Sequence, residues 1–227
     1  MKLTYYGHSC FSVFAGNKHI LFDPFVTGNE LATGIVNVDD IKADYIFLSH
    51  GHYDHVLDVE RIANNTGAMV LGNYEIYDWL NKKGLKNTHP INPGGKFSFD
   101  FGTVKCVTAV HSSSFPDGTY TGVASGFVLN TPDGNFYYSG DTGLTLDMQL
   151  IPKWVKPSFA VLPIGDGLTM GVEDAIEAAR FTEVTTVIGV HYDTFGFIKI
   201  DHNKSIETFK KAGITLHIME IGTTIDL

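Results

Sequence analysis

The sequence predicts an α/β protein, of the α+β kind, in which two β-sheets pack face to face and helices cover the outside. Runs rich in aromatic and β-branched residues dominate the first 25 residues and the middle of the chain, as is typical of strands. The last third alternates apolar strand-like runs with helix-like segments. With 227 residues, of which 44% are hydrophobic, the chain is long enough to bury a core.

The N-terminal part is expected to begin with short strands joined by tight turns. The runs LTYYG, CFSVF and HILFDPF carry the strand pattern, and Gly16-Asn17 between the last two is a hairpin signal. Residues 45–50, YIFLSH, form an apolar run that ends abruptly in polar residues, as a buried central strand does. The next elements are expected to be a helix over 57–65, a strand over 69–72 and a helix over 75–83.

The middle and the C-terminal part continue the same pattern. Pro132 to Asn135 predicts a turn, because Pro presets one backbone angle and Gly allows a positive one. Strands are expected over 96–101, 104–111, 123–130, 136–141, 159–165, 185–191 and 214–222, and helices over 172–181 and 203–211. This order of β-rich and mixed parts predicts two sheets in one sandwich.

Charge and hydropathy exclude several classes of function. The chain has 16 Lys and Arg against 25 Asp and Glu, a formal net charge of −9. A nucleic-acid partner requires a basic surface, and an anionic membrane requires a polybasic segment, so neither is expected. No apolar run reaches the roughly 18 residues of a membrane span. Cys10 and Cys106 lie in apolar runs and are expected to be buried thiols. These features predict a cytoplasmic protein.

Residues 49–55, SHGHYDH, concentrate metal-ligating side chains directly after the apolar run 45–50. His50 and His52 are two residues apart, so in an extended segment they project to the same side and can bind one ion. Asp54 and His55 continue the loop and can face a second ion. Imidazole and carboxylate ligands suit zinc, and also manganese, iron or nickel.

Three further ligand-type side chains end apolar β-runs, as His50 does. His111 ends VKCVTAVH, Asp141 ends FYYSGD and His191 ends TTVIGVH. A core does not require a titratable side chain at its rim, so this recurrence predicts that the three complete a metal site. A catalytic ion keeps one position open, so each ion needs only about three protein ligands.

Six local motifs connect this pattern to a known family. They are GHSCF at 7–11, DPFVTGN at 23–29, SHGHYDH at 49–55, GDTG at 140–143, LPIGDGLTMG at 162–171 and HYDTF at 191–195. With them the chain resembles the metallo-β-lactamase-fold hydrolases over essentially its whole length. More narrowly, it resembles bacterial and archaeal metal-dependent hydrolases related to ascorbate-phosphate lactonase. The resemblance implies a four-layer αββα sandwich in a single domain, 1–227, with a dinuclear metal site at one edge.

The resemblance also implies a role for each candidate residue. The first ion is expected on His50, His52 and His111, the second on Asp54, His55 and His191, with Asp141 bridging the two. Asp54 is the candidate catalytic residue, which orients the attacking hydroxide or carries its proton. Asp23 is expected to support the ligand loop by hydrogen bonds. His8, near the site entrance, and Thr169 are the candidate substrate contacts, together with the long loop 112–122.

The chemistry expected from these residues is hydrolysis of an ester-like bond, with a phosphodiester or a lactone favoured, in a small anionic molecule. Two divalent ions, zinc before manganese, iron or nickel, would share a bridging hydroxide formed at neutral pH. Zinc β-lactamases place a Cys among the ligands of the second ion, whereas neither Cys10 nor Cys106 stands at a proposed ligand position. His52 is intact where flavin-coupled di-iron relatives carry an acidic residue, which favours hydrolysis over oxygen reduction.

Two alternatives stay open from the sequence. A redox metalloprotein on the same fold would contain iron and consume oxygen. A non-enzymatic binding module would be expected to lose metal ligands first, and here the full set is present. Phe195 and Phe197 fit either a surface for a homo-oligomer or the wall of a pocket.

Overall fold

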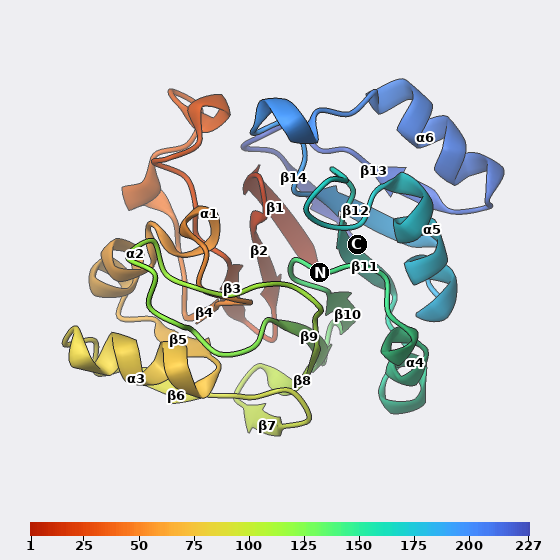
Figure 1. The fold of residues 1–227 in the computed structure, drawn as a ribbon. Coiled ribbons are helices and arrows are strands. Elements are labelled where there is room, and N and C mark those ends of the chain that lie inside the picture. Colours follow the sequence, from red (N-terminus) through yellow and green to blue (C-terminus); the bar gives the residue numbers. More distant parts are fainter.

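The protein contains two β-sheets between two groups of helices, as a computed structural model of all 227 residues shows (Figure 1). The first sheet has seven strands in the order β14-β1-β2-β3-β4-β5-β6. These strands are β1 Lys2–Gly7, β2 Cys10–Ala15, β3 Lys18–Phe22, β4 Tyr45–Phe47, β5 Met69–Gly72, β6 Thr88–Pro90 and β14 Thr224–Asp226. The pairs from β14 to β3 are antiparallel and those from β3 to β6 are parallel.

The second sheet repeats this arrangement in the order β13-β12-β11-β10-β9-β8-β7. Its strands are β7 Lys96–Phe99, β8 Gly102–Thr108, β9 Ser125–Thr131, β10 Gly134–Tyr138, β11 Phe159–Pro163, β12 Thr186–Val190 and β13 Thr215–His217. The pairs from β7 to β10 are antiparallel and those from β10 to β13 are parallel. Both sheets are therefore mixed, with an antiparallel half and a parallel half.

Six α-helices complete the fold: α1 Tyr53–Val56, α2 Val59–Thr66, α3 Tyr74–Lys82, α4 Ile151–Trp154, α5 Val172–Phe181 and α6 His202–Lys211. Their ends follow from local chemistry. The Asn73 side chain accepts a hydrogen bond from Ile76 N at the start of α3, and Asp201 does the same for Lys204 N at the start of α6. Gly67 ends α2 in a left-handed conformation, with φ of 74°.

Three apolar clusters define the layers. Phe22 and Phe47 of the first sheet meet Phe127 of the second, with the Phe47 and Phe127 ring centroids 5.1 Å apart. A second cluster packs α2 and α3 against the outer face of the first sheet, and a third packs α5 and α6 against the second sheet. This arrangement confirms the expected four-layer αββα sandwich, the metallo-β-lactamase fold, and Figure 1 shows the helices on the two outer sides.

The structure corrects the element boundaries at several places. The helix expected over 57–65 begins two residues later, as α2 Val59–Thr66. Asp58 N donates to Pro24 O, which separates α2 from α1. The strands β6 and β14 were not expected, and neither was the helix α1, because Asp54 and His55 were expected to continue a loop. Each has only three or four residues, and Pro90 in β6 is tolerated because β6 lies at the edge of its sheet.

The two cysteines and the hydropathy agree with the sequence analysis. Cys10 and Cys106 are unpaired and buried, and burial raises the pKa of the Cys106 thiol to about 12. None of the helices is both long enough and apolar enough to cross a membrane.

Candidate metal centre

The ligand motif is built by the turn that joins β4 to α1. His50 lies three residues beyond the end of β4, and His52 is the extended residue that precedes α1. Asp54 and His55 fall in the first turn of α1. The side chains of His50 and His52 project to the same side, with His50 Nε2 2.9 Å from His52 Nδ1.

The other three expected ligands also lie just beyond strand ends. His111 and Asp141 follow β8 and β10 by three residues, and His191 follows β12 by one. His191 has a positive φ of 56°, and its backbone N donates to His8 O at 3.0 Å, which ties the two sheets together at this edge. The seven side chains named from the sequence therefore meet at one end of the sandwich.

The ligand atoms form two groups. Those of His50, His52 and His111 all lie within 4.8 Å of one another, as the first expected group requires. Those of Asp54, His55 and His191 do so too, and His8 joins this second group. Each group provides three or more donors, the number needed by an ion with one open position.

Asp141 lies between the two groups. Its Oδ2 is 2.9 Å from His191 Nε2, 3.2 Å from His55 Nε2, 3.7 Å from His111 Nε2 and 4.0 Å from His50 Nε2. Its Oδ1 is buried and has no hydrogen-bond partner, and neither has His55 Nε2. Buried polar atoms without partners are uncommon and point to a missing ion or water.

The two carboxylates at the centre have no cationic side chain other than histidine beside them, which favours a bound cation. Asp54 and Asp141 pair only with histidines, and no lysine or arginine lies within ion-pair distance of either carboxylate. Burial alone would raise the pKa of Asp141, but His191 and His55 hold it well below its usual value. Burial lowers the pKa of His55, yet Asp141, Asp54 and Asp23 together raise it well above the usual value.

The first group offers neutral donors. Burial, followed by the neighbouring His55, lowers the pKa of His50 well below its usual value and also lowers the pKa of His52. Burial likewise lowers the pKa of His111. Metal ligation requires the neutral imidazole, so these shifts prepare the three side chains for it. The donor atoms of these side chains, their arrangement in two groups, the buried atoms without hydrogen-bond partners and the unbalanced carboxylates therefore all fit divalent metal ions.

Asp23 lies behind His55, as expected of a supporting residue. The carboxylate is completely buried and accepts hydrogen bonds from Ser49 N at 2.7 Å, Ser49 Oγ at 2.5 Å and Tyr138 Oη at 2.5 Å. Asp23 Oδ2 also lies 2.9 Å from His55 Nδ1, so the other ring nitrogen of His55 points to the metal centre. Such contacts fix the tautomer and the orientation of a ligating histidine.

No motif in the sequence identifies Tyr138 and Ser49 as partners of Asp23. We expect Tyr138→Phe to weaken metal affinity by about tenfold, because Asp23 loses one of the donors that hold it against His55. Tyr137→Phe is the matched control, since Tyr137 is equally buried in β10 but its Oη has no partner. Titration of metal-free protein with zinc would measure both. Equal affinities of the two variants would contradict this role of Tyr138.

The two candidate substrate contacts occupy different environments. His8 is buried, with Nε2 2.9 Å from Asp54 Oδ2 and Nδ1 3.0 Å from Thr194 Oγ1. Its side chain exposes almost no surface and holds one oxygen of Asp54, and His8 also lies in the lining of a cavity of about 560 Å³. Thr169 is half-buried in the loop after β11, and its hydroxyl lies 3.4 Å from Met170 O.

Gly165 holds His191 in place by close packing. A Cβ atom at Gly165 would lie 2.1 Å from His191 O and 3.1 Å from Ile198 Cβ. We expect Gly165→Ala to lower the free energy of unfolding by about 1–3 kcal/mol, because the backbone of His191 must shift. Urea unfolding measures the change. The control is Gly196→Ala in the neighbouring loop, where a Cβ would meet no atom within 4 Å. Unaltered stability of the Gly165 variant would refute the packing role.

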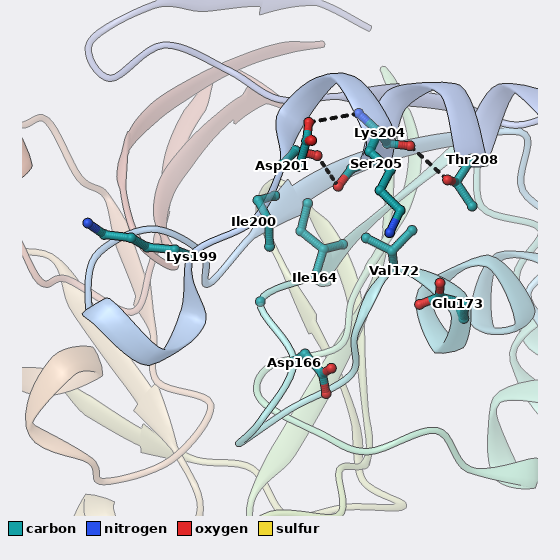
Figure 2. Close-up of a pocket in the computed structure, with 11 residues that line it drawn as sticks. Ile164, Asp166, Val172, Glu173, Lys199, Ile200, Asp201, Lys204, Ser205 and Thr208 are labelled. Atoms are coloured by element: carbon teal, nitrogen blue, oxygen red, sulfur yellow. Dashed lines mark hydrogen bonds between the residues drawn. The ribbon is translucent and has the colours of Figure 1, made fainter.

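A separate cavity lies between the loop after β11, α5 and α6 (Figure 2). Its volume is about 220 Å³, and its lining includes Glu173 and Lys204. In Figure 2 the Lys204 side chain extends toward Val172, whereas Lys199 extends away from the other labelled residues. None of the candidate metal ligands lines this cavity, so it is distinct from the metal centre.

Known proteins share this sequence and fold. Residues 18–192 match the family described as the beta-lactamase superfamily domain. A "UPF0173 metal-dependent hydrolase" of Christiangramia forsetii is 50% identical over 227 residues, which cover 100% of both chains. The "UPF0173 metal-dependent hydrolase YtkL" of Bacillus subtilis is 43% identical over 232 residues, again covering 100% of both chains.

A solved structure agrees with these relatives. Igni18, described as a novel metallo hydrolase from the archaeon Ignicoccus hospitalis, is 34% identical and superposes with a TM-score of 0.89. The match covers 99% of this chain and 97% of that chain. The chain therefore belongs to the UPF0173 metal-dependent hydrolases of the metallo-β-lactamase superfamily.

Proposed function

We propose that this hydrolase uses two divalent ions to cleave an ester-like bond in a small molecule. The main support for this proposal is the position of Asp141 Oδ2, which lies 4.0 Å or less from ligand nitrogens of both histidine groups. In this proposal Asp141 bridges the two ions. Zinc is the first candidate for both positions, and manganese, iron and nickel are the alternatives that the donor types allow.

Divalent ions bound here supply a nucleophile by lowering the pKa of water toward about 7, and they polarise the oxygen of the scissile bond. The protein's own contribution is to place and hold groups. His8 and Thr194 fix one oxygen of Asp54, which leaves Asp54 Oδ1 to orient the attacking water and accept its proton. Asp23, with Tyr138 and Ser49, keeps the ring of His55 in position.

The bond types that we favour are a phosphodiester and a lactone. The lactone follows from the sequence resemblance to ascorbate-phosphate lactonase, and the phosphodiester from the affinity of a two-ion centre for phosphoryl oxygens. His52 is a histidine at the position where flavin-coupled di-iron relatives carry an acidic residue, which supports hydrolysis over oxygen reduction.

The test is a chromogenic screen of metal-free protein reloaded with zinc or manganese. Nitrophenyl phosphodiesters, lactones and nitrophenyl thioesters are the substrates, and chelator-treated protein is the control. We expect hydrolysis of at least one bond type that disappears with the chelator and returns with the metal. Oxygen consumption by iron-loaded protein, without hydrolysis of any compound, would instead assign the fold to a redox function.

A further inference from the structure

Six chain segments surround the metal centre, and we call them together the rim. They are residues 25–41, 51–58, 109–124, 141–150, 164–171 and 191–198. Four of them carry the metal ligands His52, Asp54, His55, His111, Asp141 and His191. The rim is therefore the part of the protein that a substrate must pass on its way to the centre.

Contacts between neighbouring segments close the rim into a ring. The hydrogen bonds are Val26 N to Asp58 Oδ2 at 2.7 Å, Gly51 N to Ser113 Oγ at 3.2 Å, Gly143 N to Val110 O at 3.1 Å and Met170 N to Thr142 O at 2.9 Å. Gly165 packs on the backbone of His191. The last and first segments meet around a cavity of about 560 Å³ whose lining includes Thr194, Leu31 and Ile35.

The rim exposes large apolar side chains in every segment. Most of the large apolar side chains that are exposed anywhere on the protein lie in it. One from each segment, with its exposed fraction, is Leu31 (48%), Tyr53 (48%), Tyr120 (66%), Leu146 (72%), Leu168 (57%) and Phe197 (67%). Exposed apolar side chains on the segments that surround a reaction centre are candidates for binding an apolar group.

The rim also lacks basic side chains. None of the 16 Lys and Arg of the chain lies in the six segments. Acidic side chains do occur there, among them Asp117, Asp147 and Asp166. The nearest lysines in the sequence lie just outside, at Lys42, Lys153 and Lys199. An anionic group beside the scissile bond would therefore depend on the metal ions and on Lys83, which lines a pocket with the rim residues Tyr53 and Asp117. It would find no guanidinium or ammonium partner among the side chains of the rim itself.

An aromatic path leads from the metal centre to the outer part of the rim. The ring centroid of Phe195 lies 5.5 Å from that of His8, which contacts the Asp54 carboxylate. Phe197 stacks on Phe195 with centroids 5.7 Å apart and an interplanar angle of 13°. An apolar group attached close to the scissile bond would find these two rings beside it.

We propose that the substrate is neutral and apolar: a carboxylic ester, lactone or thioester whose acyl or aryl group packs against the rim. This inference rests on the proposed function and replaces the anionic substrate expected from the sequence. In the reaction, the oxygen of water bonds to the acyl carbon while the bond from that carbon to the leaving oxygen or sulfur breaks. The leaving alcohol or thiol takes up a proton. A substrate is the occupant because each of the six segments around the metal centre carries an exposed apolar side chain.

The test compares nitrophenyl acetate, butyrate and octanoate with the anion bis(nitrophenyl) phosphate, each with zinc-loaded protein. We expect kcat/KM to rise along the ester series and to be lowest for the phosphate anion. Phe197→Ala should lower the octanoate-to-acetate ratio roughly tenfold, the scale of selectivity that apolar pockets achieve. Phe14→Ala is the matched control, because Phe14 is also an exposed Phe but lies on β2, outside the rim.

Two lysine variants separate the apolar rim from an anion site. Leu168→Lys places a cation in the rim, and we expect it to lower activity on the octanoate ester and raise activity on the phosphate anion. Lys199→Met removes the cation that follows the last segment and should change neither. The proposal would be overturned if the wild-type enzyme preferred the phosphate anion over the esters and Lys199→Met lost activity on this anion.

Binding of hydroxamates to the zinc-loaded protein tests the rim without any turnover. Octanohydroxamate should bind at least roughly tenfold more tightly than acetohydroxamate, and Phe197→Ala should remove most of this difference. If no ester, lactone or phosphate is hydrolysed, the proposed function is wrong. The ratio of the affinities for octanohydroxamate and acetohydroxamate still tests whether the rim binds an apolar group. Equal binding of the two hydroxamates would overturn the inference. The inference would also be overturned if Phe197→Ala changed the molecular mass measured by light scattering but left the ratio of the two hydroxamate affinities unchanged. That result would assign the rim to contact with a second copy of the chain.

Discussion

Asp54→Asn is expected to lower kcat by roughly 10²–10⁴-fold, the range in which a positioned general base contributes to catalysis. Asn keeps the shape of the side chain and one oxygen near His8, but it cannot accept the proton of the attacking water. Burial raises the pKa of Asp54, but His55 and His8 lower it by more, so the pKa lies well below its usual value. The carboxylate is therefore ionised at neutral pH and can accept a hydrogen bond from the attacking water. Steady-state hydrolysis of the best substrate in the screen measures the loss.

The control for Asp54→Asn is Asp226→Asn, which changes an exposed carboxylate on β14, outside the rim. We expect Asp226→Asn to retain activity and both variants to retain the thermal unfolding of the wild type. Turnover by Asp54→Asn at the wild-type rate would show that another group handles the proton.

Asp141→Ala is expected to have the second large effect, on both ions together. Because Asp141 Oδ2 lies near nitrogens of both histidine groups, its removal should weaken both positions and not only one. We expect the metal content after dialysis to fall from about two ions per chain to below one, with activity at background. Inductively coupled plasma mass spectrometry measures the content.

Two comparisons make the Asp141 result specific. Asp147→Ala removes an exposed carboxylate from the same loop and should leave two ions bound. His111→Ala removes a ligand of the first group only, so the second ion should remain. Asp141→Ala protein that loses one ion and keeps the other at full affinity would contradict the bridging position.

The ligands could be predicted from the sequence because their signals are local. His50 and His52 lie two residues apart in an extended segment, so their common direction follows from backbone geometry alone. His111, Asp141 and His191 each follow an apolar run within a few residues, and the ends of central strands meet at one edge of the sandwich. The layers followed from the order of strand-like and helix-like segments, together with the family resemblance.

The supporting contacts could not be predicted, because they depend on packing between distant parts of the chain. Tyr138 donates to Asp23 across 115 positions of sequence, and Thr194 contacts His8 across 186. The local sequence around Tyr137 and Tyr138 does not predict which of the two hydroxyls makes a hydrogen bond. The strand β14 was missed for the same reason, since its three residues are fixed only by pairing with β1 at the other end of the chain.

The central claim is that seven side chains from both sheets converge to hold two divalent ions. The most direct measurement is the anomalous scattering of crystals of zinc-loaded protein, recorded on both sides of the zinc absorption edge. We predict two peaks per chain, one among His50, His52 and His111 and one among Asp54, His55 and His191, with Asp141 between them. A single peak, or peaks away from these residues in protein saturated with zinc, would contradict the two-ion centre.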